Sequence, residues 1–459
     1  MRRAPARALR AVVVLTAGSL VSCTEPLPMR GHLRLHIDTD APLPSGKNAP
    51  ADAFIPAPLF DTLRVELYPT GEETPCAGCT REFELTQERV AEGATFTVLQ
   101  ESGSRARVLL FRSRDAASGL PNMRLESWTA LPRPPDTGAI DVTIAMRVDR
   151  LGTPQGSASE PLEPALGLAT PLAPWSLATR RDCTHPARAG AVCVPGGAFV
   201  MGDAALRGFG DYDSDIRKVV VLSPFFLDAS EVTVGEYRRG DGPIGPKDYL
   251  PWSGSLAGAS LQDWCTYTER PGPHEDYPMN CVVHAAARAF CIGRGGDLPT
   301  EAQLEYVEGG LASQRYPWGM DRPECNDAVW GLGGFQGSPT TAPFANSCRP
   351  STGTDEQVMG YVKPVTSQEQ RKRDFVDVRG ARIVDVAGSL AEWARDAFAP
   401  QTSVCWSRSI LIDPICEIGE ERVMRGGSWL VLSAAAGRSS LLPNSANTIV
   451  GLRCAYPAD

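Results

Sequence analysis

Cysteines constrain the fold of this chain more than any other feature of its sequence. The chain of 459 residues contains 13 of them, which leaves 12 once Cys23 near the N-terminus is set aside. In an oxidising compartment such an even set forms a disulfide framework. Sequence proximity predicts all but one of the bonds, and the last joins the two cysteines that remain. The predicted pairs are Cys76–Cys79, Cys183–Cys193, Cys265–Cys281, Cys325–Cys348, Cys405–Cys416 and Cys291–Cys454.

A zinc site is the alternative interpretation of the shortest spacing, Cys76-Ala77-Gly78-Cys79. Two cysteines separated by two residues have the spacing of zinc ligands. Neither a second cysteine pair nor histidines accompany them nearby in the sequence. A disulfide is therefore the preferred interpretation.

Residues 1–22 have the pattern of a lipoprotein signal peptide. Several arginines precede an apolar run of about ten residues, which is too short to cross a bilayer as a helix. The run ends in Leu20-Val21-Ser22-Cys23, a resemblance to the bacterial lipobox, in which the cysteine is acylated and becomes the mature N-terminus. An ordinary cleaved signal peptide with a chance cysteine is the alternative. We take Cys23 as the lipidation site.

A lipid anchor would hold the protein at the cell envelope. Acyl chains stabilise attachment because their methylene groups are buried in the bilayer. Residue 24 is Thr rather than the Asp that resembles an inner-membrane retention signal, which favours the outer membrane, on its periplasmic or its surface side. The net charge of -9 gives no electrostatic reason to expect a nucleic-acid partner.

The rest of the chain divides into two predicted domains. After a tether over residues 23–30, apolar and polar residues alternate through residues 31–150, as in Leu33, Leu35 and Ile37. This period of two, interrupted by turn residues, predicts a small all-β sandwich. Residues 151–181 are rich in proline and predict a linker or a chain draped on the next domain, and residues 182–459 form the second domain.

Seven short motifs follow one another through the second domain. Thr300 begins one of them and stands three residues before Gln303, which is the pattern of a capping box at a helix N-terminus. The motifs are the segments at residues 194–202, 225–237, 285–291 with 298–306, 316–319, 385–393, 425–429 and 451–454.

In this order the motifs resemble those of the formylglycine-generating enzyme, or sulfatase-modifying factor, family. The resemblance implies an α+β domain with little regular secondary structure, related to C-type lectin domains. Turns, disulfides and bound ions stabilise such a fold, which agrees with 44 glycines and 39 prolines. The family also joins its helix cysteine to its terminal Arg-Cys segment, which fits Cys291–Cys454.

The resemblance also implies structural calcium. The implied ligands of one site are Asp385, Gly388, Leu390 and Glu392, the two glycine-turn residues through their carbonyls. Hard oxygen ligands on a short turn suit Ca²⁺. A capping Asp and a surface Glu are the alternative, and Ser389 replaces the usual Asn of the family. A second site would fall on Asn326 and Asp355.

Two catalytic cysteines of the family are missing. Active members carry them six and eleven residues beyond the Arg that corresponds to Arg425, where they bind copper(I). Val431 and Ala436 stand at these positions. Aliphatic side chains cannot replace soft thiolate ligands, so no copper is expected. The five histidines are dispersed, which argues against the family branch with a three-histidine iron site.

The predicted function is therefore a non-catalytic binding or scaffold module on a membrane-anchored lipoprotein. A protein or peptide partner would occupy the old substrate groove near Trp429 and Arg438. An enzyme with altered chemistry in the same groove is one alternative, and a sulfatase-modifying oxidoreductase with compensated cysteines is another. A structural lipoprotein of the envelope is the third. Convergent titratable groups with perturbed pKa values in the groove would favour an enzyme.

Overall fold

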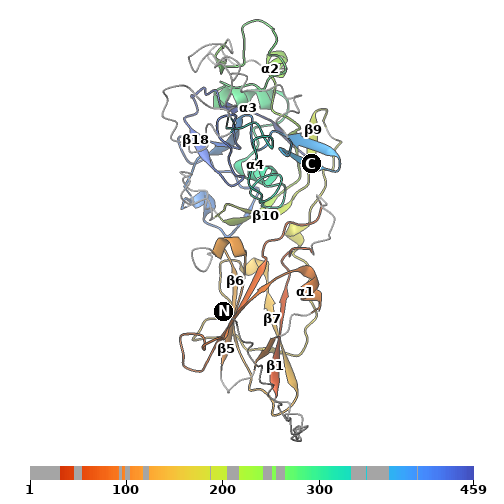
Figure 1. Cartoon of the computed structure of the whole chain (residues 1–459), viewed down its shortest axis with the longest axis vertical. Helices are drawn as coiled ribbons and strands as arrows, with labels where there is room; N and C mark the ends of the chain where they lie inside the picture. The colour runs from red at the N-terminus through yellow and green to blue at the C-terminus, as the bar shows by residue number, and fades with distance from the viewer. Residues whose placement is uncertain are drawn as a thin grey trace, which may run out of the picture.

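The computed structural model places two folded parts at opposite ends of an elongated molecule (Figure 1). It describes residues 31–45, 54–92, 96–98, 104–116, 123–186, 188–203, 217–240, 251–254, 264–331, 348, 372–400 and 402–458. Cys23 lies outside these residues, as does Asp355. Among the described residues, no helix is both long enough and apolar enough to cross a bilayer.

The first part contains two four-stranded sheets, which are formed by β1 to β8. Leu33 and Leu35 on β1 are fully buried while Arg34 between them is exposed, as the alternation predicts. One sheet has the order β4-β1-β7-β8 and the other the order β3-β2-β5-β6. The strands are β1 (His32–Thr39), β2 (Thr62–Tyr68), β3 (Thr80–Glu84), β4 (Phe96–Val98), β5 (Arg105–Phe111), β6 (Leu125–Ala130), β7 (Ala139–Met146) and β8 (Ala165–Leu166); the helix α1 (Gln87–Glu92) accompanies them.

The proline-rich segment covers one edge of each sheet. The Trp128 N–H of β6 donates to the Gln155 carbonyl, and the Ala130 N–H donates to the Leu162 carbonyl, both at 2.8 Å. A few residues further on, β8 pairs with β7 in the other sheet. Residues 155–166 therefore pack on the first domain, whereas Arg181 at the end of the segment exchanges two backbone hydrogen bonds with Gly196 of the second domain. Open strand edges expose unpaired N–H and C=O groups, and this segment satisfies them.

The second part combines short strands with three helices among its described residues. Its sheets have the orders β10-β11-β16, β20-β12-β9, β13-β14 and β18-β17-β15-β19. The strands are β9 (Ala191–Val194), β10 (Gly197–Met201), β11 (Lys218–Leu222), β12 (Phe225–Asp228), β13 (Phe375–Val378), β14 (Ala381–Val384), β15 (Ala391–Ala397), β16 (Ile410–Ile412), β17 (Arg422–Arg425), β18 (Ser439–Leu441), β19 (Val450–Gly451) and β20 (Ala455–Pro457). The predicted α+β class with little regular secondary structure is confirmed.

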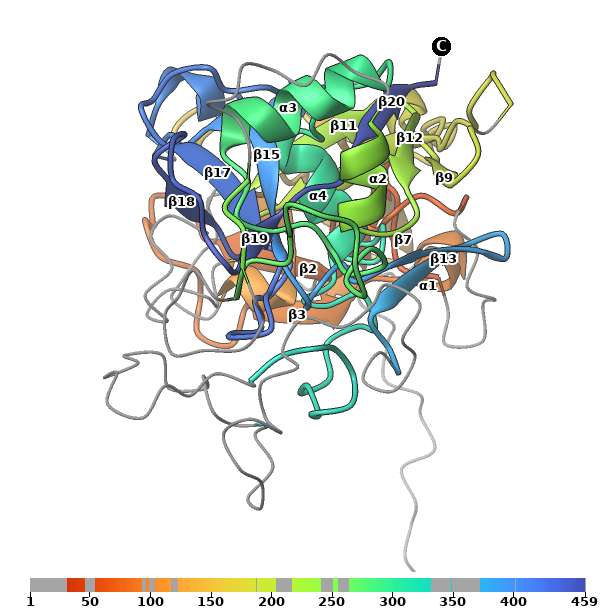
Figure 2. The ribbon, with the colours of Figure 1, turned by 90° about the horizontal axis from the view of Figure 1, so that it is seen from above.

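The helices are α2 (Val234–Arg239), α3 (His284–Gly293) and α4 (Glu301–Glu308), seen from above in Figure 2. The Thr300 hydroxyl accepts a hydrogen bond from the Gln303 N–H, and the Gln303 side chain accepts one from the Thr300 N–H. This is the predicted capping box. Thr233 and Glu236 make the same arrangement at the start of α2.

All of the predicted disulfides are present. Cys291 of α3 is bonded to Cys454, 163 residues further along the chain, so that helix is fixed to the segment before β20. The other bonds are Cys76–Cys79, Cys183–Cys193, Cys265–Cys281, Cys325–Cys348 and Cys405–Cys416. The bond between Cys76 and Cys79 consumes the two thiolates that a zinc ion would need there.

The two parts share one hydrophobic cluster. Ala198 and Val200 of β10, with Val219 and Val221 of β11, belong to the same buried cluster as the sandwich core. The next residues on each strand, such as Val220, instead belong to the core of the second domain. Because side chains alternate along a strand, this β10–β11 hairpin packs one face on each domain.

Candidate functional site

Two of the sequence motifs, at residues 385–393 and 425–429, pack directly against each other. A Cβ atom on Gly427 would lie 2.0 Å from the Ala387 carbonyl oxygen, so only glycine allows this approach. Gly426 has a φ of +80°, which also favours glycine. The Trp429 N–H donates to the Ser389 carbonyl at 2.7 Å. The glycine turn at residues 425–429 is thus packed directly on the turn at residues 385–393.

Arg425, the last residue of β17, lies at the centre of a buried ionic cluster with the glutamates of α4. Its Nη1 lies 2.8 Å from Glu301 Oε1, and its Nη2 lies 2.5 Å from Glu305 Oε2. Burial works to raise the pKa of Glu301, but Arg438 and Arg425 outweigh it and hold that pKa below its ordinary value. Burial raises the pKa of Glu308, at the end of α4, well above its ordinary value.

The two residues predicted to line a groove lie in the interior. Arg438 is 2% exposed, and its Nε and Nη2 contact Glu301 at 2.5 and 2.9 Å. Trp429 is 3% exposed, and its Nε1–H donates to the Thr448 carbonyl. Both side chains therefore stabilise the fold and offer no surface to a partner.

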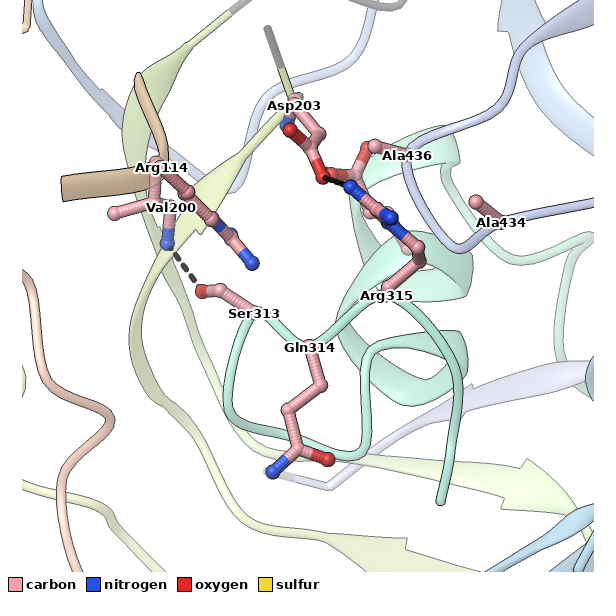
Figure 3. A pocket seen from close by; sticks show the side chains of 10 residues that line it. Arg114, Val200, Asp203, Ser313, Gln314, Arg315, Ala434 and Ala436 are labelled. Carbon is pink, nitrogen blue, oxygen red and sulfur yellow. Dashed lines mark hydrogen bonds and ion pairs between the residues drawn. The ribbon is translucent and has the colours of Figure 1, made fainter. Parts of the chain in front are cut away.

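A hollow lies instead between β10, α4 and the segment that contains Ala436. Its volume is only about 10 Å³, and it is partly open to solvent. The lining residues, most of them labelled in Figure 3, are Arg114, Val200, Gly202, Asp203, Glu305, Ser313, Gln314, Arg315, Ala434 and Ala436. Ala436 is one of the two positions where active relatives are expected to carry a cysteine.

The charged groups of the hollow are partly paired. Arg315 Nη2 lies 3.5 Å from Asp203 Oδ2. Glu305 Oε1 accepts a hydrogen bond from the Gly202 N–H at 2.5 Å, while its other oxygen contacts Arg425. The Ser313 hydroxyl accepts one from the Val200 N–H at 2.8 Å. These contacts fix the walls of the hollow.

Arg114 enters the hollow from the first domain, a placement that sequence reasoning missed. It lies on the 3₁₀ turn Ser113–Ala116, where Arg112 contacts Asp115 at 2.6 Å and donates to the Gly202 carbonyl at 3.2 Å. Burial, together with the nearby charge of Arg112, lowers the pKa of Arg114 to about 10. No local pattern could reveal this arginine, because the contact joins two domains.

The predicted calcium turn is buried, and Arg453 lies against it. Asp385 is 1% and Glu392 4% exposed, and Arg453 Nε lies 2.6 Å from Glu392 Oε1. Arg453 Nη2 also donates to the Asp385 carbonyl at 2.8 Å. The donors suit a hard cation in kind, but the guanidinium already contacts two of the residues. Calcium at Asp385, Gly388, Leu390 and Glu392 stays a prediction.

The second predicted calcium site cannot be assembled from the described residues, because Asp355 lies outside them. Asn326 is described, and its carbonyl accepts a hydrogen bond from the Lys372 N–H at 2.9 Å.

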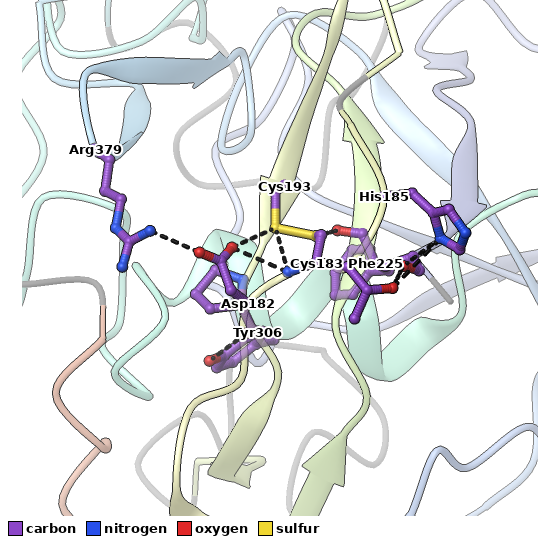
Figure 4. The surroundings of a disulfide bond; sticks show 10 residues. Asp182, Cys183, His185, Cys193, Phe225, Tyr306 and Arg379 are labelled. Atoms are coloured by element: carbon purple, nitrogen blue, oxygen red, sulfur yellow. Dashed lines mark hydrogen bonds and ion pairs between the residues drawn. A yellow bond between two sulfur atoms is a disulfide. The ribbon is translucent and has the colours of Figure 1, made fainter.

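One further group has the spacing of metal ligands. Asp182, Cys183 and Cys193 are the only three His, Cys, Asp or Glu side chains of the described residues that gather closely enough. The two sulfurs form a disulfide, and Asp182 Oδ2 lies 2.7 Å from Arg379 Nη1 (Figure 4). Disulfide sulfurs are not thiolates, so this group is structural.

Comparison with known proteins gives a consistent picture. The sequence model of one family, described as "Sulfatase-modifying factor enzyme 1-like domain", matches residues 178–458. A formylglycine-generating enzyme of Streptomyces coelicolor is 31% identical over 313 residues, which are 59% of this chain and 90% of that protein. The "Inactive C-alpha-formylglycine-generating enzyme 2" of Bos taurus is 25% identical over 307 residues, 58% of this chain and 88% of that protein.

Solved structures resemble part of this chain more distantly. PvdO from Pseudomonas aeruginosa has a TM-score of 0.39 and 18% identity, over 58% of this chain and 93% of its own. The variable protein 1 of Treponema denticola has a TM-score of 0.36 and 19% identity, over 54% of this chain and 89% of its own.

Proposed function

We propose, from the premise that this chain belongs to the sulfatase-modifying factor enzyme 1-like family, that it is a non-catalytic binding module held at the cell envelope. Family membership supports a scaffold built around a former catalytic centre. The relative from Bos taurus whose name begins with "Inactive" supports the view that the scaffold can persist without the chemistry. The binding role then falls to the hollow at that centre.

The lining of the hollow carries this proposal. Ala436, one of the two positions where the active relatives are expected to place a thiolate, forms part of its wall beside Ala434. Every cysteine that the structure describes is in a disulfide. Copper(I) in proteins is held by soft sulfur ligands. The described residues therefore offer no thiolate that could replace the missing pair.

An enzyme with altered chemistry is the second candidate, and the hollow gives it less support. A general base needs a lone pair within reach of a substrate proton. The two carboxylates here are Asp203, which pairs with Arg315, and Glu305, whose oxygens contact Gly202 and Arg425. Histidine and cysteine are absent from the described lining. The geometry favours recognition over proton transfer.

The decisive experiment measures copper and aldehyde together. The purified mature protein would be titrated with copper(I) and incubated with a cysteine-bearing sulfatase peptide. The formylglycine-generating enzyme of Streptomyces coelicolor serves as the positive control. We expect neither tight copper binding nor conversion of the peptide cysteine to formylglycine. Conversion by the wild-type chain would overturn the proposal.

The anchor and the calcium belong to the same proposal. Lipidation at Cys23 rests on the lipobox sequence, and mass spectrometry of the mature N-terminus tests it.

For calcium, the expected ligands include Asp385 and Glu392, and an ion there would supply positive charge to a buried acidic turn. Chelation would then lower the thermal stability of the wild type but not of Asp385→Asn. An unchanged wild-type stability after chelation would contradict the calcium proposal. It would mean that Arg453 alone compensates the negative charge of the turn.

A further inference from the structure

The sheet with the order β10-β11-β16 is satisfied along its β10 edge. The Val200 N–H donates to the Ser313 hydroxyl at 2.8 Å, and the Gly202 N–H donates to Glu305 at 2.5 Å. Glu305 lies on α4, and Ser313 lies in the segment that follows it. Side chains therefore bind the N–H groups at this edge that point away from β11, and no further strand can be added there.

The opposite edge of the same sheet is formed by β16, which pairs with β11 in parallel. The Val219 N–H of β11 donates to the Ser409 carbonyl at 3.1 Å. Because main-chain groups alternate in direction along a strand, the N–H and C=O groups of Ile410 and Ile412 point away from β11. They make no hydrogen bond to any residue in the described part of the chain. An edge with unpaired groups of this kind is a template for another strand.

The loop that contains β16 is rigid and leaves the strand accessible. Ile412 is 62% exposed. The disulfide between Cys405 and Cys416 closes the loop around the strand. The Cys416 N–H also donates to the buried Asp396 of β15 at 2.8 Å, which ties the loop to the core. A strand that is already ordered loses little conformational entropy when it binds a partner.

Opposite charges stand at the two ends of β16. Arg408 precedes the strand and Asp413 follows it, and both are exposed. Asp413 accepts hydrogen bonds from the N–H and the hydroxyl of Ser223, at 2.7 and 2.8 Å, and both donors are uncharged. Neither charged side chain has an ion pair within the described ranges. A segment that runs antiparallel to β16 is therefore complementary when it is basic at its N-terminal end and acidic at its C-terminal end.

We propose that β16 binds an extended segment of a partner protein as an additional, antiparallel strand. The inference deepens the binding-module function proposed above, on which it rests, and places the contact at the edge of the sheet opposite the hollow. In strand addition, main-chain hydrogen bonds give affinity and alternate side chains give specificity. The segment would contain a basic residue, two apolar residues separated by one other residue, and an acidic residue, in that order.

The register follows from the open groups of the edge. The first apolar residue would lie opposite Ile412 and the second opposite Ile410, and each pair would exchange two main-chain hydrogen bonds. Both apolar side chains would then lie on the same face as these isoleucines. Ile410 already packs against the hydrophobic cluster shared by the two domains, so the bound segment would extend that cluster over the exposed Ile412. The N–H of the middle residue would point away from β16.

The test measures binding of the peptide Lys-Val-Thr-Val-Glu, with both ends blocked and a fluorescent label, to the full mature chain by anisotropy. N-methylation of either valine should weaken binding by at least about tenfold, because it removes an N–H that faces β16 and places a methyl group in the interface. N-methylation of the threonine is the matched control and should leave the affinity nearly unchanged, since that N–H faces solvent.

Variants of the protein identify the edge. Ile412→Pro removes an outward N–H at a position where an edge strand tolerates proline, so it should abolish binding without changing the unfolding temperature. Ile292→Thr, at an isoleucine of α3 that is 54% exposed, is the control for non-specific apolar contact and should bind normally. Arg408→Glu should weaken binding of the first peptide and favour Lys-Val-Thr-Val-Lys.

Three results would overturn the inference: no binding of any peptide of the set, equal affinity for the valine-methylated and threonine-methylated peptides, or unchanged binding by Ile412→Pro. Sedimentation of the free protein tests a rival occupant. A concentration-dependent dimer that Ile412→Pro abolishes would show that a second copy of this chain, and not a partner segment, covers the edge. The copper and aldehyde assay is independent of these outcomes, so the two proposals can fail separately.

Discussion

Buried charge distinguishes individual residues of the second domain from those of an ordinary apolar core. The side chains of Arg425 and Glu301 are both fully buried and 2.8 Å apart. Arg438 contacts the same carboxylate from a position 137 residues away in the chain. Such pairs need each other, because breaking one leaves an uncompensated charge out of water.

The first prediction concerns Arg425. Arg425→Met should lower the free energy of unfolding by about 3–5 kcal/mol, because it leaves the buried Glu305 without its cation and Glu301 with Arg438 alone. Chemical denaturation measures the change. The control is Arg147→Gln, whose pair with Asp149 is half exposed at 3.3 Å and should cost at most about 1 kcal/mol. Equal costs for the two variants would show that the buried cluster carries no special stability.

The second prediction concerns the buried His284. Burial lowers its pKa to about 4, despite a hydrogen bond between Nε2 and the Ala394 carbonyl at 2.9 Å. The unfolded chain, with a pKa near 6.5, therefore takes up the proton first as the pH falls. Stability should fall between pH 6.5 and pH 4, by about 3 kcal/mol in all from this residue.

His284→Gln can still donate to the Ala394 carbonyl but does not titrate in this range. The quantity to measure is the difference in unfolding free energy between wild type and this variant at several pH values. We expect the difference to change in favour of the variant as the pH falls. A constant difference from pH 7 to pH 4 would contradict the assignment.

At the scale of elements, local patterns predicted what local contacts decide. The capping box at Thr300 formed because a threonine and a glutamine three residues apart satisfy each other's N–H groups. Cysteines that lie close together in the sequence also paired as predicted, because a short connecting loop keeps them near each other. The prediction that Arg438 lines a groove was wrong, because the arginine is buried against Glu301. The sequence does not show which carboxylate will pair with a buried arginine. The edge-covering role of residues 155–166 likewise depends on distant strands.

The third prediction tests the interlocked turns. Gly427→Ala would place a Cβ 2.0 Å from the Ala387 carbonyl, so the two motif segments must separate. We expect a loss of about 3 kcal/mol or more, or failure to fold, because backbone atoms cannot move aside cheaply. Gly71→Ala is the control: its φ is positive, at +78°, whereas that of Gly427 is not, and open space surrounds the site. That change should cost about 1 kcal/mol, and a similar cost at Gly427 would refute the close packing.

For the whole molecule, the shared hydrophobic cluster decides how the two domains behave together. Sequence alternation predicted the strands of the sandwich, and the family resemblance predicted the second domain. Neither predicted that β10 and β11 would present alternate residues to both, because a period of two shows only that a strand has two faces. The position of Arg114 is a consequence of this packing, since the hollow exists only where the domains meet.

The fourth prediction follows from the two faces of β11. Val221 faces the cluster shared with the sandwich, and Val220, one residue earlier, faces the core of the second domain. Because both domains bury apolar area against the hairpin, calorimetry of the wild type should show one cooperative transition. Val221→Asp places a charge in the shared cluster and should split this transition in two. Val220→Asp should lower the unfolding temperature of the second domain directly. If Val221→Asp left a single transition, the domains would be coupled by something other than this hairpin.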